Sequence, residues 1–598
     1  PIKYVIVSDP MFESVLQAFI EWKTKKGFTV IEAYTDNPLV GSTTSSIKSY
    51  LEGLYNNATV NDPAPTYLLI VGDVAQVPTF TGTSSSHVTD LYYCEYDGSG
   101  DFYPEIYYGR FSATNNEQLI PQIDKTLEYE QYQMPDPSYL NEVVMIAGVD
   151  AGMAPTYGNG QINYGTDNYF NLAHGLTSHT YLYPASASSA SQIIQDVSNG
   201  VGYANYTAHC GPSGWSDPSF STSDVPGLQN EHEYPLMVGN CCSSVEFQQN
   251  ECFGEAVLRA ANKGAVGYIG GSNSTYWNED FWWGVGSGSI SANPTYAQTG
   301  LGAYDRTFHD NGEAEIDWYV TQGQMISAGN LAVTAAGGSE HYYWEIYHLM
   351  GDPSVMIYFS VPPALSVSCM PAVPMGASTL TVTTEPNAYI AISNNGVLLD
   401  AKYADATGIV NLQFSPLNYI GSALIVGTKQ NRAPYIDSIS VISVNAPFVV
   451  YTSAVIDDSQ ENNNSQADFG ETVLLDVTLS NLGTIDGQNV SATLNTTDPN
   501  VTIINSTSIW GTIAGSANVL INGAFEIQVN GIIEDMHNVA FTIDIVDDNS
   551  NTWTSFMNIN LHAPKLVVNN FIINDSQGNN NGRLDPGEQV IISLNSEN

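Results

Sequence analysis

Basic side chains are scarce in this sequence. Its 598 residues include 15 lysines and arginines against 61 aspartates and glutamates, which gives a formal net charge of -46. Such a surface repels nucleic acids and anionic membranes, so we expect neither as a partner. The acidity by itself is typical of a protein kept soluble in a salty or calcium-rich medium.

Long apolar runs are missing as well. No segment approaches the roughly 18 apolar residues of a membrane-spanning helix, so we expect no membrane span. The chain opens at Pro1 on a predicted strand, and we expect any signal peptide or pro-segment to be absent from it. Tyrosine, asparagine, serine, threonine and glycine are abundant, which suits an extracellular protein.

Cysteine is the third scarce residue type. The six cysteines do not form the framework of a small disulfide-rich domain. Three of them, Cys210, Cys241 and Cys242, follow His209 within 35 residues. This grouping marks a candidate site.

Up to about residue 358, apolar strand-like runs alternate with helical patterns. Such alternation predicts a largely parallel sheet with helices on both faces. We expect an N-terminal α/β subdomain at 1–135 and a second, catalytic one at 136–358. The predicted strands are residues 3–9, 28–34, 66–73, 142–150, 202–211, 234–242 and 264–272.

Short alternating strands with turn signals follow residue 358. They predict β-sandwiches of the immunoglobulin type at 359–446 and 447–562. Residues 455–481 are repeated at 572–598, so 563–598 is expected to begin a further β module that is cut off. We therefore expect the chain to be a fragment of a longer protein.

Asp150, His209 and Cys242 each follow an apolar strand run. Sites in open α/β sheets form beyond the carboxyl ends of the strands, so a shared cleft is expected. A thiol beside an imidazole is the pair that nucleophilic cysteine catalysis needs. From spacing alone, three alternatives stay open: buried structural cysteines, a Cys241–Cys242 redox pair, or a zinc site that includes Cys210.

Long ordered motifs carry a family resemblance. They include NYTAHCGPSGW, YPLMVGNCC, ECFGEAVLRA, YIGGSNSTYWNEDFWWGVGS and HYYWEIYHLMGDPSVM. Over roughly residues 3–445 the sequence resembles the gingipains, a family of caspase-like cysteine peptidases, and most closely its lysine-specific branch. The resemblance implies a caspase-like catalytic domain of two α/β/α subdomains, followed by the sandwiches.

The resemblance also implies roles for the residues at the strand ends. Cys242 is the expected nucleophile, His209 the catalytic histidine and Asp150 the acid that orients its ring. The backbone N–H groups of Cys242 and Cys210 are expected to bind the oxyanion. The family usually has glycine at the position of Cys210, and glycine adopts torsions that cysteine resists. From the residues alone, Asp150 is equally a helix cap or a surface carboxylate.

Asp280 is the candidate specificity residue. Its position in STYWNEDFWW resembles that of the acid that binds the substrate lysine, and Thr207 and Trp277 resemble pocket-lining residues. A carboxylate also attracts arginine, which we expect as the second choice. A protease that cuts after basic residues benefits from having few of its own. Without the resemblance, Asp280 is more often a solvated loop acid or a helix cap than a specificity residue.

Calcium is the expected cofactor, because several oxygen ligands lie within short loops. One loop resembles a calcium loop of the family, and the two copies of the repeat offer similar acids; an ordinary acidic turn is the alternative. The candidate ligands are Asp97, Asp101, Tyr103 (by its carbonyl), Glu105, Asp458, Glu471, Asp575 and Glu588.

Taken together, the sequence predicts a secreted or cell-surface cysteine endopeptidase that cleaves after lysine, with protein or peptide substrates. The alternative is a surface adhesin or structural array protein, in which the β modules matter and the peptidase domain is inactive or processes only itself. The truncated repeat favours the alternative, whereas intact His209, Cys242 and Asp280 favour the peptidase. The sequence leaves the oligomeric state open.

Overall fold

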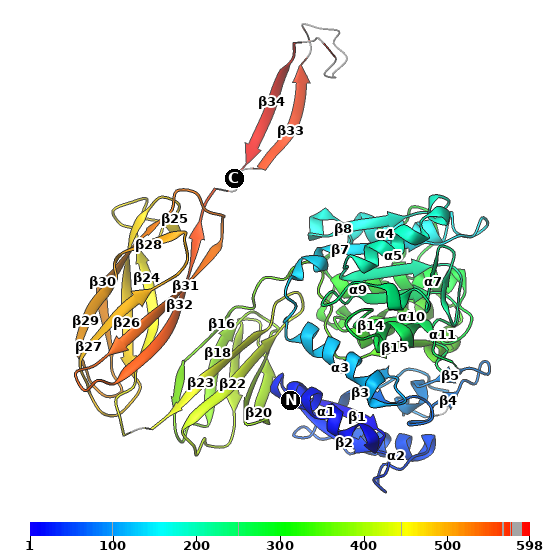
Figure 1. Ribbon diagram of the computed structural model, residues 1–598, viewed down its shortest axis with the longest axis horizontal. Helices are drawn as coiled ribbons and strands as arrows, with labels where there is room; N and C mark the ends of the chain where they lie inside the picture. Colours follow the sequence, from blue (N-terminus) through cyan, green and yellow to red (C-terminus); the bar gives the residue numbers. More distant parts are fainter. Residues whose placement is uncertain are drawn as a thin grey trace. The chain divides into compact units, whose positions relative to one another are not determined.

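Figure 1 shows the computed structural model of the chain. It describes residues 1–98, 100–248, 250–443, 445–564, 567–574, 576, 586 and 589–597. They divide into two compact units. The larger is Pro1–Cys369 with Thr381–Phe414 and Ala423–Asp437, and the smaller is Met370–Leu380 with Ser415–Ser422 and Ser438–Asn598. Among the described residues, no helix has the length and apolar character to cross a bilayer.

A ten-stranded sheet runs through the larger unit in the order β2-β1-β3-β6-β15-β14-β13-β9-β7-β8. Its strands are β1 (Ile2–Ser8), β2 (Phe28–Tyr34), β3 (Pro65–Val71), β6 (Tyr107–Phe111), β7 (Glu142–Ala147), β8 (Thr177–Tyr181), β9 (Tyr203–Thr207), β13 (Leu236–Asn240), β14 (Gly267–Gly271) and β15 (Tyr347–Gly351). Among these described pairs, only β14–β15 is antiparallel. The two halves meet where Met350 of β15 pairs with Arg110 of β6.

Both faces of this sheet are buried. In β7, Val143, Met145 and Ala147 belong to one apolar core, and Val144 and Ile146 belong to another. Neighbouring residues of a strand point to opposite faces, so each face has its own cover. The predicted α/β fold, a largely parallel sheet with both faces covered, is thereby confirmed.

Eleven helices accompany the sheet in the described part of the chain (Figure 1). They are α1 (Glu13–Lys25), α2 (Thr44–Asn56), α3 (Asn116–Glu130), α4 (Gly158–Asn168), α5 (Ala190–Ser198), α6 (Phe253–Arg259), α7 (Trp277–Val285), α8 (Tyr296–Thr299), α9 (Ala303–Phe308), α10 (Gln322–Ala335) and α11 (Glu340–Ile346). Short strands form two further sheets: β4 (Phe80–Thr81) with β5 (Val88–Thr89), and β10 (Cys210–Gly211) with β11 (Gly214–Ser216) and β12 (Ser219–Ser221).

Among the described residues after 358, strands are the only regular secondary structure, which confirms an all-β region. Its first strands are β16 (Val367–Cys369), β17 (Ala372–Pro374), β18 (Thr379–Thr384), β19 (Tyr389–Asn394), β20 (Val397–Tyr403), β21 (Ile409–Gln413), β22 (Gly421–Thr428) and β23 (Tyr435–Ile442). The immunoglobulin type and the boundaries of 359–446, 447–562 and 563–598 stay predictions.

Two antiparallel-rich sheets build the smaller unit, in the orders β24-β26-β30-β28 and β25-β32-β31-β27-β29. Alternate residues of β26 are buried, so one face of this sheet packs on the core and the other is open. The strands of these two sheets are β24 (Val449–Asp457), β25 (Ala467–Asp468), β26 (Thr472–Asn481), β27 (Gly487–Asn495), β28 (Val501–Asn505), β29 (Thr507–Ile513), β30 (Asn518–Val529), β31 (His537–Val546) and β32 (Thr552–His562). A separate antiparallel pair is formed by β33 (Val567–Asn574) and β34 (Ile591–Glu597).

Candidate active site

The candidate catalytic residues follow three neighbouring strands, β13, β9 and β7. Asn240 pairs with Thr207 at the end of the β13–β9 ladder. Cys242 and His209 each stand two residues beyond that pair, and Asp150 follows β7, the next strand. Because the carboxyl ends of parallel strands share one edge of a sheet, the three side chains lie at the same edge, as the sequence predicts.

His209 and Asp150 are joined by a hydrogen bond at this edge. The Nε2 atom of His209 lies 3.0 Å from Oδ2 of Asp150. The backbone N–H groups of Gly152 and Met153 donate to the other carboxylate oxygen, at 2.8 and 2.9 Å. The hydrogen bond from His209, helped by these amides, lowers the pKa of Asp150. With Nε2 held by Asp150, the Nδ1 atom is left to serve the substrate.

Cys242 is a half-buried free thiol. The backbone N–H of Thr275 donates to its sulfur at 3.3 Å, and the next residue, Ser243, has a φ of 55°, which turns the chain sharply after the strand. No hydrogen bond among the described residues joins Cys242 to His209. Such contacts commonly tighten only when substrate binds.

Thr275 is not among the residues predicted from the sequence. Thr275 belongs to the loop after β14, and β14 is the neighbour of β13, the strand that precedes Cys242. Strand order therefore brings the loop beside the nucleophile, and strand order is not visible in the local sequence.

Cys210 and Cys241 form a disulfide, with their Cα atoms 5.2 Å apart. The sequence analysis did not predict this bridge. The bridge excludes the Cys241–Cys242 redox pair, because the Cys241 sulfur is bonded to Cys210. It also excludes the zinc site, because neither of the two bridged sulfurs is a free thiolate. Cys210 lies in the short strand β10 and is not among the described residues with positive φ, so the position does not require glycine.

Asp280 is buried, with 3% of its surface exposed, which excludes a solvated loop acid. It lies in the first turn of α7. Thr275 donates its hydroxyl to one oxygen at 2.7 Å, and Tyr343 and Tyr347 donate to the other at 3.0 and 2.7 Å. Burial raises the pKa of Asp280 to about 7, although these hydroxyl donors counteract part of the effect.

The two predicted pocket-lining residues lie near this acid and the dyad. Thr207 is buried and pairs with Asn240, whose side-chain amide donates to the Tyr347 hydroxyl at 3.0 Å. Trp277 packs its ring edge-on against His209, with 5.7 Å between the ring centres. Thr207 is therefore connected, through Asn240 and Tyr347, to the carboxylate of Asp280.

A surface hollow of about 450 Å³ borders the same loops. It is lined by Ser84, Ser85, Asn273, Ser274, Tyr276, Ser339 and Tyr342. Ser274 and Tyr276 flank Thr275, so the hollow opens next to the loop that holds the nucleophile.

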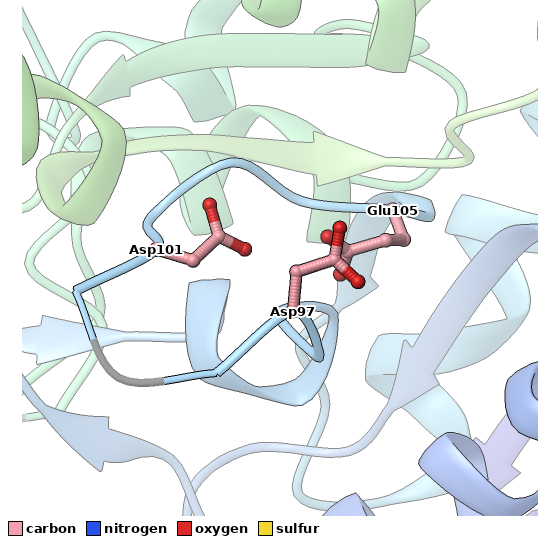
Figure 2. A group of neighbouring side chains, drawn as sticks. All are labelled: Asp97, Asp101 and Glu105. Atoms are coloured by element: carbon pink, nitrogen blue, oxygen red, sulfur yellow. The ribbon is translucent and has the colours of Figure 1, made fainter.

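The first predicted calcium loop gathers its acids. Ligand atoms of Asp97, Asp101 and Glu105 lie within 4.8 Å of one another, and Figure 2 shows the three carboxylates on one loop. One buried oxygen of Asp101 has no hydrogen-bond partner. Burial raises the pKa of Glu105 to about 7, and the charges of Asp101 and Asp97 add to this shift. Tyr103 donates its backbone N–H to Asp101.

The other predicted calcium ligands are arranged differently. Asp458 accepts the backbone N–H groups of Asn464 and Ser465, and Glu471 accepts that of Asp468. In the part of the chain that the structure describes, three metal-ligating side chains meet only at Asp97, Asp101 and Glu105. The predicted ligands Asp575 and Glu588 lie outside the described residues.

A strand-end thiol beside an imidazole–carboxylate pair, on a mainly parallel sheet, defines the class of caspase-like cysteine peptidases. The chain belongs to peptidase family C25, whose family model matches residues 1–358.

Known proteins similar to this chain include gingipains. The chain is 37% identical over 449 residues to Lys-gingipain of Porphyromonas gingivalis, an alignment that covers 73% of this chain and 25% of that protein. It is 25% identical over 425 residues to Gingipain R2 of the same species, covering 69% of this chain and 54% of that protein. The chain therefore spans about a quarter of the length of Lys-gingipain.

Solved structures show the same fold. One described as "Structure of Protease" is 37% identical, has a TM-score of 0.70 and covers 74% of this chain and 97% of its own. A crystal structure of the Arg-specific cysteine proteinase gingipain R has a TM-score of 0.63 at 21% identity, covering 74% of this chain and 98% of its own. The second likeness supports the fold alone.

Proposed function

We propose that this chain is a cysteine endopeptidase that cleaves peptide bonds after lysine, with arginine as second choice. The observation that carries the proposal is the connection of Thr275 to both functional groups. Its amide donates to the Cys242 sulfur, and its hydroxyl donates to the buried carboxylate of Asp280. The buried carboxylate and the nucleophile are thus connected through a single residue. The likeness to Lys-gingipain, named for lysine, supports this choice.

The chemistry follows from the placement of the groups. The Cys242 thiolate attacks the carbonyl carbon of the peptide bond, and the oxyanion accepts the backbone N–H groups of Cys242 and Cys210. His209 gives its proton to the leaving amine as the C–N bond breaks. It then takes a proton from water, whose oxygen attacks the acyl-enzyme and releases the Cys242 thiolate, which restores the starting pair. Asp150 holds the imidazole ring in place.

The hydroxyl groups around Asp280 favour lysine over arginine. Three hydroxyls already occupy its two oxygens. An ammonium is a compact charge with three donors, which hydroxyl and carboxylate oxygens can share. A guanidinium is a planar fork that binds best to two carboxylate oxygens at once.

A panel of fluorogenic peptides with Lys, Arg, norleucine or Asp before the cleaved bond tests the proposal. We expect the highest kcat/KM for Lys and loss of cleavage in Cys242→Ala. The matched control is Cys369→Ser, at a half-buried free thiol, which we expect to retain activity. Equal rates for all four peptides, or full activity in Cys242→Ala, would exclude this function.

We also propose that the protein works outside the cell, secreted or at the surface. The Cys210–Cys241 disulfide supports this, because disulfides persist in oxidising compartments. Protein substrates are the expected partners. Detection of the protein by antibody in culture medium or on intact cells tests the proposal, and detection only after lysis contradicts it.

We propose that calcium binds the loop of Asp97, Asp101 and Glu105, with the Tyr103 carbonyl as a further ligand. The unpartnered oxygen of Asp101 supports this, since a buried carboxylate oxygen without a partner is costly. The same ion is proposed for Asp458 with Glu471, and for Asp575 with Glu588, on the acid pattern of the repeat.

Chelation followed by a thermal melt tests the calcium proposal. We expect a chelator to lower the melting temperature of the wild type and excess calcium to restore it. Asp101→Asn is expected to remove most of this response, whereas Asp36→Asn, at an exposed position, keeps it. An Asp458→Asn variant measured in parallel tests the second site. Identical melting curves with and without chelator contradict all three sites.

A further inference from the structure

The Cys210–Cys241 disulfide occupies a distinctive place in the catalytic centre. Cys210 directly follows His209, and Cys241 directly precedes Cys242. One covalent bridge therefore connects the turn that carries the imidazole to the turn that carries the thiol.

Other contacts hold each turn to its own side of the sheet. His209 is held by Asp150, and its carbonyl accepts the backbone N–H of Ser216 at 2.9 Å. Cys242 is held by Thr275, at 3.3 Å. Asp150 follows β7 and Thr275 follows β14, so these contacts lead away from the strand pair β9–β13 in opposite directions.

The hydrogen-bond ladder between these two strands stops short of the catalytic residues. Its last pair is Thr207 with Asn240. Beyond it, no hydrogen bond among the described residues joins His209 to Cys242. The disulfide joins Cys241, one residue past the final pair on β13, to Cys210, three residues past that pair on β9. At this point the ladder no longer fixes the separation of the two chains.

The bridge is anchored in an apolar core. Cys241 is fully buried in an apolar core, and the partly buried Cys210 packs against the same core. Cys210 also pairs with Trp215 across the β10–β11 hairpin. Cys241 is buried, whereas Cys242 is half-buried and free, so the bridge uses the sulfur on the core side and leaves the Cys242 thiol available.

We propose that the Cys210–Cys241 disulfide is a positioning device, which fixes the distance between the His209 imidazole and the Cys242 thiol. The inference rests on the proposed peptidase function. Its consequence is that the enzyme needs one thiol reduced and the adjacent pair oxidised. Two equivalents of a thiol reductant, RSH, convert the bridge to two thiols and form RSSR, and this is expected to lower turnover although Cys242 stays reduced.

The test compares the full chain with the double variant Cys210→Ala/Cys241→Ala. A single replacement would leave an unpaired thiol beside Cys242. The double variant removes both cysteines and so avoids this. We expect kcat for a Lys peptide to fall about 10- to 100-fold, the range that misplacement by about 1 Å produces, with KM changed less than about twofold. Cys369→Ser is the matched control and is expected to behave as the wild type.

A second measurement needs no mutation. Wild type in a mild monothiol, which keeps Cys242 reduced, is compared with wild type in a strong dithiol, and peptide mapping shows whether the bridge is open. We expect kcat to fall as the bridge opens, whereas the double variant does not respond to the dithiol. Unchanged kcat in the wild type with an open bridge, or in a folded double variant, overturns the proposal.

Alkylation of Cys242 by iodoacetamide separates this inference from the proposed function, because it needs no substrate. An imidazole held beside a thiol stabilises the reactive thiolate. At mildly acidic pH, we expect faster alkylation of Cys242 in the bridged protein than in the double variant. If no peptide is cleaved but this difference is seen, the peptidase proposal fails and the positioning role stands. Equal alkylation rates in the bridged protein and the double variant contradict the positioning role of the bridge.

Discussion

At the scale of single residues, Asp280 is an acid prepared for a cation. Among the described residues, no basic side chain forms an ion pair with it, and hydroxyl groups alone surround its carboxylate. Burial without a positive partner is what raises its pKa to about 7. A substrate ammonium would supply the missing charge.

This arrangement predicts a pH dependence specific to lysine substrates. In the free enzyme Asp280 is neutral below its pKa of about 7 and ionised above it, so attraction of the ammonium grows as the pH rises through 7. We expect the ratio of kcat/KM for a Lys peptide to that for a norleucine peptide to increase over this interval. The ratio cancels the titration of the catalytic dyad, which both peptides use.

Asp280→Asn is the control for that experiment. Removal of one partner of a buried charge pair costs about 2 kcal/mol or more, so the ratio is expected to fall about 30-fold at high pH and to lose its pH dependence. A wild-type ratio that stays constant with pH contradicts the assignment of lysine recognition to Asp280.

The sequence predicted part of this site. Strand ends indicated Asp150, His209 and Cys242, because apolar runs are visible in the chain. Spacing could not choose between Cys241 and Cys242; only the family resemblance did. In the structure Cys241 is bridged and Cys242 is free. The bridge itself was missed, because it depends on which strands become neighbours and where their ladder ends.

At the scale of elements, α7 carries two of the residues that we propose bind the substrate. It begins at Trp277 and includes Asp280. Farther along it, the buried Trp283 lies against α10, where a Cβ atom on Gly329 would come within 2.2 Å of the indole. Close approach of these two helices therefore depends on glycine at position 329.

Gly329→Ala is expected to destabilise the larger unit by about 1–3 kcal/mol, the usual cost of overpacking a buried contact. Since α7 must shift to relieve the clash, kcat/KM for a Lys peptide is expected to fall as well. Gly53→Ala is the matched control, because Gly53 lies inside α2 with nothing within 4 Å of an added Cβ. There we expect about 0.5–1 kcal/mol of stabilisation.

Denaturant unfolding and peptide cleavage, measured on the same preparations, check both variants. Equal stabilities for Gly329→Ala and Gly53→Ala contradict the packing argument. The sequence could predict the strands of the sheet, since their apolar runs are local. It could not predict the burial of α7, because Asp280 and Glu279 give its first turn a polar appearance while tertiary contacts bury both.

At the scale of the whole molecule, the acidity limits which substrates approach. A formal net charge of -46 produces a negative potential around the protein that attracts cationic peptides and repels anionic ones. The sequence predicted this property completely, because net charge is a sum over residues and needs no fold. The same sum says nothing about where the acids meet, and the grouping of Asp97, Asp101 and Glu105 required the structure to be seen.

The charge predicts a salt dependence that varies with the substrate. For a peptide with a net positive charge, kcat/KM is expected to fall several-fold as salt rises, since the Debye length shrinks to about 10 Å at 0.1 M. A second peptide has the same residues around the cleaved bond and added aspartates at its far end, which make its net charge negative. For this peptide we expect kcat/KM to rise with salt. Initial rates of both peptides, measured over a salt series, test this prediction. Parallel curves would show that the charge of the whole protein does not guide substrate to Cys242. Selection of the cation would then rest on Asp280 alone.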